Sequence, residues 1–129
     1  MRLLLDTHFL IWMVIDPGEI GRREKVLISR NDLVVSPVSI WELRNKWQKH
    51  GGNKSRRDLL DPSVALAYVI GTGLELAPLT GEDCAAALDT LMPHHDPFDE
   101  MLLIHAQRLG AKLLTRDTQL VDHPLAISA

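Results

Sequence analysis

The sequence has 129 residues, 46% apolar and 24% charged, with a net charge of −3, which is the composition of an ordinary globular protein with one hydrophobic core. Its one cysteine, Cys84, excludes an internal disulfide, and no apolar run is long enough to span a membrane. We therefore expect a single domain over residues 1–129 that lies in the cytoplasm and has no membrane contact.

The first predicted elements are a buried strand over residues 3–5 and an apolar helix over residues 9–15. Asp6 follows the strand directly, at the carboxyl end, which is where open parallel sheets bind their ligands. The nearest basic residue in the sequence, Arg2, stands at the other end of the strand, so a buried Asp6 carboxylate would lack a cation. His8 is expected either to line the same site or to be an ordinary polar neighbour.

The next predicted elements are a helix over residues 17–30, a strand over residues 33–35 and a helix from Val38 towards His50. Glu42 lies in the first turns of the third helix, among apolar neighbours. A second carboxylate is therefore expected just beyond a strand end.

A basic segment runs from Arg44 to Arg57 and contains no acidic residue. Its cations are Arg44, Lys46, Lys49, Lys54, Arg56 and Arg57. In a chain with a negative net charge, this concentration favours a surface that guides a nucleic-acid backbone. The alternative is a solvated helix face followed by a basic loop.

In the second half of the chain, a helix is predicted over residues 63–70 and an alternating strand over residues 74–79. Residues 80–83 form a predicted capping box that opens a helix over residues 84–92. Strands and helices therefore alternate in this half of the chain as well.

The stretch from His94 to Ala106 joins acidic residues to the start of an apolar helix. Because a residue before proline is disfavoured in the helical conformation, the helix should begin at Pro97, after Asp96, and end at Gly110. Asp99 then lies in the first turn. Taken alone, a carboxylate at this place is explained as a helix cap. A functional role requires other carboxylates to reach the same place.

The last predicted strands cover residues 111–114 and 124–127, and Asp117 follows the first of them, where we expect another helix to begin. The alternation of strands and helices predicts an α/β sandwich with a mostly parallel sheet. Such a sheet would bring four carboxylates to one edge, namely Asp6, Glu42, Asp99 and Asp117.

Four carboxylates in one cleft repel one another unless a cation lies between them. Oxygen ligands suit Mg²⁺ or Mn²⁺, and His94 and His95 lack further ligands at the spacing of a zinc site. The sequence contains no P-loop, no glycine-rich nucleotide fingerprint and no nucleophile elbow. Metal-dependent hydrolysis of a phosphodiester is therefore the chemistry that fits best.

Four segments resemble, in order, the motifs of PIN-domain proteins, and specifically those of VapC-type toxins from toxin-antitoxin pairs. They are Leu3–His8, Val38–Leu43, His94–Asp99 and Leu113–Asp117. The resemblance implies a three-layer α/β/α PIN domain, a Mg²⁺- or Mn²⁺-dependent endoribonuclease activity and a VapB-like antitoxin as partner. It assigns catalysis and metal binding to Asp6, Glu42, Asp99 and Asp117. It gives Asp96 and Thr115 supporting roles in cofactor binding.

Two positions depart from the pattern of similar members. Glu100 stands where arginine is usual, and residues 104–106 read Ile-His-Ala where Ala-Gln-Ala is usual. Two other functions fit the motifs: a PIN nuclease that cuts DNA or flap structures, and a catalytically weak PIN module that binds an antitoxin. A phosphatase with an aspartate nucleophile would need a second Asp where His8 stands.

The predicted apolar segments over residues 9–15 and 20–28 carry more apolar side chains than one small core obviously needs. We expect them to form a groove for the antitoxin and a surface through which the chain makes a homodimer. The basic segment from Arg44 to Arg57 would guide the RNA substrate.

Overall fold

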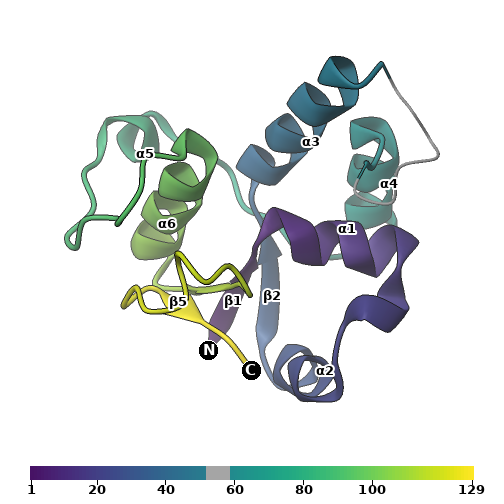
Figure 1. The fold of residues 1–129 in the computed structure, drawn as a ribbon, viewed down its shortest axis with the longest axis horizontal. Helices are drawn as coiled ribbons and strands as arrows, with labels where there is room; N and C mark the ends of the chain where they lie inside the picture. Colours follow the sequence, from purple (N-terminus) through teal and green to yellow (C-terminus); the bar gives the residue numbers. More distant parts are fainter. Residues whose placement is uncertain (52–58) are drawn as a thin grey trace.

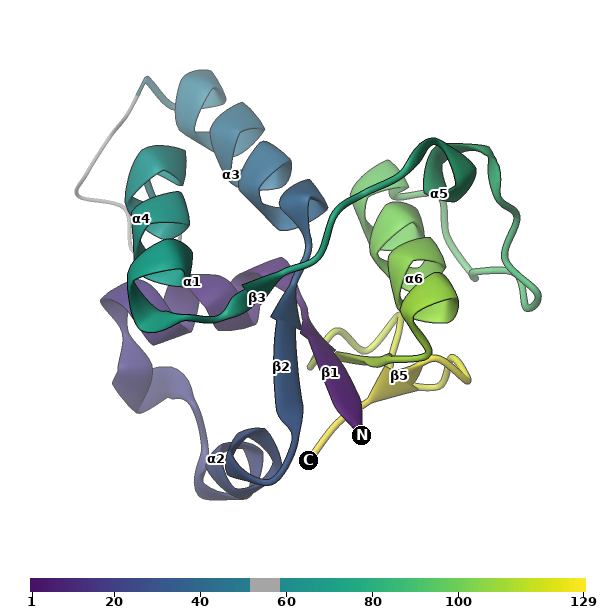
Figure 2. The same cartoon turned by 180° about the vertical axis from the view of Figure 1, so that it is seen from behind.

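The computed structural model describes residues 1–51 and 59–129, which form one sheet flanked by helices (Figure 1). Its strands are β1 (Arg2–Leu5), β2 (Asp32–Val35), β3 (Glu75–Leu76), β4 (Lys112–Leu114) and β5 (Ala126–Ile127). They lie in the order β3-β2-β1-β4-β5, and all four pairings are parallel. The predicted parallel α/β fold is therefore confirmed. The two ends of the chain lie near each other (Figures 1 and 2).

The helices are α1 (Thr7–Ile15), α2 (Arg22–Ser29), α3 (Pro37–Lys49), α4 (Pro62–Thr72), α5 (Gly81–Ala85) and α6 (Pro97–Leu109), with a 3-10 turn η1 (Pro17–Glu19). The helices α3, α4 and α6 begin in the same way, with a side-chain cap followed by proline. The cap satisfies a free N–H group, and proline lacks the N–H that a first turn leaves unused. These three helix starts follow from local sequence.

Alternate side chains of the central strands point to opposite faces of the sheet. Leu3 and Leu5 pack with α1 and α4 on one face, whereas Leu4 and Val34 pack with α6 on the other. Helices therefore cover both faces, as Figure 2 also shows. This arrangement is the three-layer α/β/α sandwich that the motifs implied.

Two predicted elements are shorter than expected and one is interrupted. Residues 17–30 form η1 and α2 rather than one helix, because Gly21 adopts an extended conformation between them. The strand predicted over residues 74–79 pairs only over Glu75–Leu76. The helix predicted over residues 84–92 is wrong, since α5 ends at Ala85.

A contact with α6 accompanies the early end of α5. Gln107 of α6 accepts a hydrogen bond from Asp89 N and donates one to the carbonyl of Ala87. These bonds engage backbone groups of the segment after α5, where a longer helix was expected. The capping box of Thr80 and Asp83 is confirmed.

The segment after β4 also differs from the prediction. Asp117 follows the strand as expected, but turns rather than a helix come after it. Leu120 N and Val121 N donate hydrogen bonds to the carbonyl of Asp117, which closes the first of these turns.

Most apolar side chains of the N-terminal helices pack in or against the hydrophobic core. Phe9, Leu10, Ile11 and Ile20 are buried, so the predicted excess of apolar surface on these segments is wrong for these residues. The exposed large apolar side chains among the described residues are Met1, Ile15, Val26, Trp41, Val64, Ile70 and Leu91.

Within the described ranges, no helix combines the length and the apolar character that crossing a membrane requires.

Candidate active site

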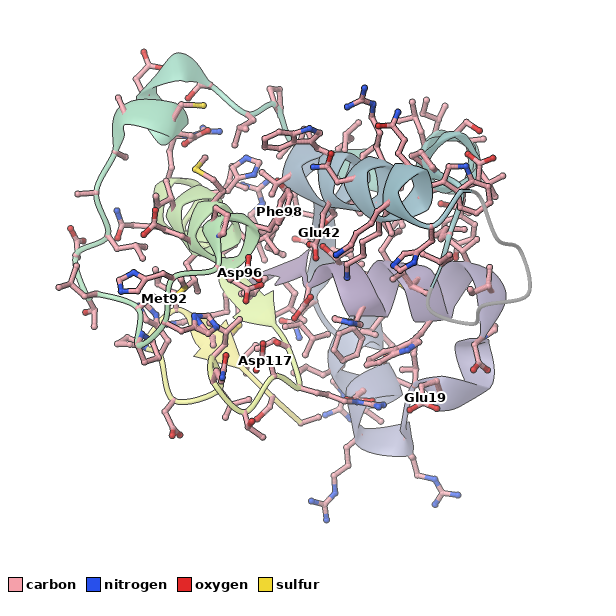
Figure 3. The ribbon with its side chains drawn as sticks, turned by 45° about the horizontal axis from the view of Figure 1, so that its top comes forward. Glu19, Glu42, Met92, Asp96, Phe98 and Asp117 are labelled. Atoms are coloured by element: carbon pink, nitrogen blue, oxygen red, sulfur yellow. The ribbon has the colours of Figure 1, made fainter. Side chains whose placement is uncertain are left out.

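A cleft of about 360 Å³ receives side chains from α1, α3, the start of α6 and the segments that follow β1 and β4. Its acidic lining residues are Asp6, Glu42, Asp96, Asp99 and Asp117. Figure 3 shows Glu42, Asp96 and Asp117 around the space between α1, α3 and α6. The structure therefore brings together all four carboxylates of the predicted cluster, together with Asp96.

Asp6 caps α1 and is held by two neighbours. Its Oδ2 atom accepts a hydrogen bond of 2.6 Å from the Thr115 hydroxyl, and its Oδ1 atom accepts one of 3.3 Å from His8 N. Burial favours a raised pKa for Asp6, but the hydrogen bonds from His8 and Thr115 outweigh it and hold the pKa below its usual value. Asp6 is therefore ionised at neutral pH.

Thr115 is fully buried and connects two of the acids. Its hydroxyl donates to Asp6 and accepts a 3.0 Å hydrogen bond from Asp117 N. Thr115 does not line the cleft itself, so it contacts the site through the two aspartates. Its position fixes the direction in which the Asp6 carboxylate points.

Glu42 is fixed from two sides. The Thr7 hydroxyl lies 2.7 Å from Glu42 Oε1 and 2.9 Å from Ser39 Oγ. Because the carboxylate can only accept, Thr7 donates to Glu42 and accepts from Ser39. On the other side, Lys46 Nζ lies 3.3 Å from Glu42 Oε2.

One face of α3 supplies the basic wall of the cleft. Glu42, Asn45, Lys46 and Lys49 all line it, and their spacing of three, four and seven residues places them on one side of the helix. Part of the predicted basic segment therefore adjoins the acids. Its cations Lys54, Arg56 and Arg57 lie outside the described residues.

At the start of α6, Asp96 caps the helix and Asp99 faces its acidic neighbours. Asp96 Oδ1 accepts hydrogen bonds from Phe98 N at 2.9 Å and Asp99 N at 3.2 Å. Burial, together with the negative charges of Asp96 and Asp6, raises the pKa of Asp99 to about 7. The helix cap expected at this position and the repulsive acidic cluster are therefore both present.

His94 joins the cluster, which the sequence did not predict. One donor atom each from His94, Asp99 and Asp117 lie within 4.8 Å of one another, and His94 Nε2 is 3.4 Å from Asp99 Oδ2. Pro97 lies between His94 and Asp99 in the sequence and interrupts the regular spacing from which their proximity could have been predicted. A signal was available in the two histidines before Asp96, but nothing in the sequence indicated which of them would turn inward.

Arg116 is a cation next to the cluster in sequence that does not line the cleft. Its guanidinium lies 4.3 Å from the centre of the Trp12 ring and donates hydrogen bonds of 2.6 and 2.5 Å to Glu24. It also pairs with Glu19 at 3.0 Å. The pKa of Glu24 is lowered by Arg116. The Arg116 guanidinium therefore binds Glu24 of α2 and does not neutralise the acids of the cleft.

The donor set of the cleft fits a divalent cation. Carboxylate oxygens suit Mg²⁺ and Mn²⁺, and the nearby imidazole nitrogen of His94 is better accepted by Mn²⁺ than by Mg²⁺. Burial is the largest cause of the raised pKa of Asp99, and repulsion from the neighbouring carboxylates, which a bound cation would offset, adds to it.

The family model described as PIN domain matches residues 3–124. The chain belongs to the PIN domain family. Among solved structures, this PIN domain is similar to a chain in the crystal structure of VapBC2 from Rickettsia felis bound to a DNA fragment from their promoter. The TM-score is 0.63 at 14% identity, and the match covers 100% of this chain and 98% of that chain. At this identity the similarity concerns the fold. No curated protein sequence matched.

The two departures from the usual PIN pattern have different surroundings. Glu100 is exposed on α6 beside Asp99. His105 is fully buried, and its Nδ1 atom lies 2.8 Å from the Ser36 hydroxyl and its Nε2 atom 3.2 Å from the Pro78 carbonyl. Since a carbonyl can only accept, Nε2 carries the proton and Ser36 donates to Nδ1. In this PIN domain His105 is therefore a structural link between α6 and the start of α3.

Proposed function

We propose that this PIN domain is a metal-dependent endoribonuclease, the toxin of a VapBC-type pair, which hydrolyses RNA phosphodiester bonds with Mg²⁺ or Mn²⁺. The observation that supports this best is the convergence in one cleft of five acidic side chains from four segments of the chain. Lys46 and Lys49 line the same cleft, so a site for a cation adjoins a site for a phosphate backbone. PIN-family membership supports a nuclease.

Each residue has a separate role in the proposal. Asp6 and Asp99 hold the principal ion, while Glu42 and Asp117 orient bound water or a second ion. Asp96 positions Asp99 by capping α6, and Thr115 orients Asp6. When bound, the ion would polarise a phosphoryl oxygen and lower the pKa of a water molecule.

A VapB-like antitoxin is the partner that we propose. The support is the similarity in fold to a chain of the VapBC2 complex. Co-expression with the protein encoded by an adjacent short reading frame, followed by co-purification, tests this partner.

The nuclease proposal is tested with the antitoxin-free protein and a single-stranded RNA. We expect cleavage with Mg²⁺ or Mn²⁺, none in EDTA, and a loss of at least about 100-fold in Asp6→Asn and Asp99→Asn. The matched control is Asp32→Asn, an exposed acid at the start of β2, which should keep wild-type cleavage. Cleavage that survives EDTA, or that both cleft variants retain, would contradict the proposed mechanism.

The same assay separates RNA from DNA. An RNA and a DNA of one sequence are offered side by side, and the proposal requires that the RNA is cut. Preferential cutting of the DNA would support a DNA or flap nuclease instead. Failure to cut either substrate, with metal binding retained, would support a binding module.

A further inference from the structure

A second hollow, which we call the side pocket, has a volume of about 480 Å³ and lies between the segment before α6 and the segment after β4. Its polar lining residues are Thr90, His94, Thr118, Gln119, Asp122 and His123. Apart from His94, none of these side chains belongs to the acidic cleft. The residue roles proposed above therefore leave the side pocket without an assigned function.

The side pocket adjoins the acidic cleft at two places. His94 forms part of its wall, while His94 Nε2 lies 3.4 Å from Asp99 Oδ2 in the cleft. On the opposite wall, Thr118 follows Asp117 directly in the chain. A ligand with a phosphate in the cleft can therefore place an attached group in the side pocket.

Hydrogen bonds hold the walls of the side pocket in place. The buried ring of His123 donates from Nε2 to the Thr90 carbonyl at 2.8 Å and accepts at Nδ1 from Leu125 N at 3.1 Å. This ring joins the two segments that form the pocket. Gln119 N donates to Asp117 Oδ1 at 2.9 Å, which ties the pocket to the cleft. A preformed pocket binds a ligand with little cost of ordering.

The lining favours a group that combines apolar surface with polar edges. Leu91 and Pro93 offer apolar surface, whereas Gln119 and Asp122 offer polar groups. The described lining residues include neither lysine nor arginine, so a second phosphate is a poor occupant. A nucleobase has the required combination of an apolar face and a polar edge.

Asp122 is the lining residue whose chemistry can distinguish among the bases. A carboxylate has two acceptor oxygens and no donor. On its Watson-Crick edge guanine presents two adjacent N–H donors, while each of the other bases places acceptors beside its donor. Asp122 can therefore accept two hydrogen bonds only from guanine.

We propose that the side pocket binds an unpaired guanine base of an RNA whose backbone lies in the acidic cleft, with Asp122 accepting from its Watson-Crick edge. This proposal rests on the proposed ribonuclease function and names the base that the enzyme selects next to the cleaved bond.

Binding of nucleosides tests the pocket without cleavage. Guanosine and adenosine are each titrated in EDTA into the protein of 129 residues, and their binding is followed by NMR. We expect guanosine to bind at least ten-fold more tightly, and Asp122→Asn to remove most of this difference. The matched control is Asp89→Asn, an exposed acid outside the pocket, which should leave it unchanged. Equal binding of the two nucleosides by the wild-type protein would overturn the proposal, and this comparison needs no variant.

Cleavage tests the same pocket within the proposed function. Two single-stranded RNAs of uridines are compared, one with a single central guanosine and one with a central adenosine. We expect the guanosine RNA to be cut at least ten-fold faster, and the ratio to fall towards one in Asp122→Asn. Metal-dependent cleavage of both RNAs at equal rates would contradict the proposal of guanine binding in the side pocket and would still support the proposed nuclease activity. Selective guanosine binding without any RNA cleavage would support guanine binding in the side pocket and would contradict the proposed nuclease activity.

Discussion

At the scale of single residues, the acidic cleft depends on side chains that do not themselves face it. Thr115 holds Asp6, and Thr7 holds Glu42, each through a buried hydroxyl that donates to a carboxylate oxygen. Such hydrogen bonds stabilise the charged form of the acid and fix its orientation. The carboxylates are therefore set in place before any cation arrives.

Thr115→Val removes this hydroxyl while nearly keeping the shape of the side chain. We expect the affinity for Mn²⁺, measured by isothermal titration calorimetry, to fall by about ten-fold or more, because Asp6 loses the donor that orients it. Thr115→Ser keeps the hydroxyl and serves as the control. An unchanged affinity in Thr115→Val would show that Asp6 is held without this bond.

The charge of Asp99 destabilises the metal-free protein. With its pKa raised to about 7, the protonated form stabilises the fold at low pH, and this contribution is lost as the pH rises through 7. We therefore expect Asp99→Asn to stabilise the metal-free protein by roughly 1–2 kcal/mol at pH 8, since solvent screens part of the repulsion, and to have little effect only near pH 4, where Asp99 is protonated in the folded and in the unfolded protein. Urea unfolding in EDTA measures both values. A variant that is less stable than the wild type at pH 8 would contradict this account.

At the scale of elements, α6 connects the cleft to the rest of the fold. Its first turn carries Asp99, and its buried middle carries His105, which bonds to Ser36 at the start of α3. Ser36 also accepts a hydrogen bond from Val38 N, so one hydroxyl caps α3 and contacts α6. The helix that supplies Glu42 is thereby tied to the helix that supplies Asp99.

This link should make stability depend on pH. Burial lowers the pKa of His105 below its ordinary value of 6.5, so the unfolded chain binds the proton more readily than the folded protein. The stability contributed by neutral His105 is present above pH 6.5 and lost as the pH falls. We expect the free energy of unfolding to decrease more steeply between pH 7 and pH 5 in the wild type than in His105→Gln.

Denaturant unfolding at several pH values measures this slope. The control is His95→Gln, which changes an exposed histidine on the segment before α6 and should keep the wild-type slope. Equal slopes for the wild type and His105→Gln would show that His105 does not titrate in this window.

At the scale of the whole molecule, the two faces of the sheet have different surroundings. The face covered by α1 and α4 carries exposed apolar side chains on its outer helices, of which Ile70 is 69% exposed and Val64 48%. Ile15, at the end of α1, is 43% exposed. Since α1 packs against α4, these side chains belong to one outer layer.

The predicted homodimer surface covered residues 9–15 and 20–28, and this layer shares only Ile15 with it. We expect this layer to mediate a homodimer, because association removes the exposed apolar surface from water. In Ile70→Asp, the protein concentration at which half of the chains are dimeric should rise by about ten-fold, as measured by sedimentation velocity. Leu91→Asp changes a side chain that is 83% exposed in the segment before α6, and it should leave the profile unchanged. A wild-type protein that stays monomeric at high concentration would refute the homodimer.

The sequence by itself determined the alternation of strands and helices along the chain, the start of α6 at Pro97 after Asp96, and the convergence of the acids. These features follow from local rules: apolar runs make strands, proline after a capping residue starts a helix, and parallel strands end at one edge. Asp6 and Glu42 could therefore be assigned to one site before any distance was known.

Only the tertiary structure decided which neighbours these acids have. It turned His94 towards Asp99, drew Arg116 away onto Glu24, and placed α6 against the segment after α5. Each outcome depends on how closely two segments pack, and packing distances are set by side chains that are far apart in sequence or separated by a proline. The periodicity of a single segment contains no information about such distances.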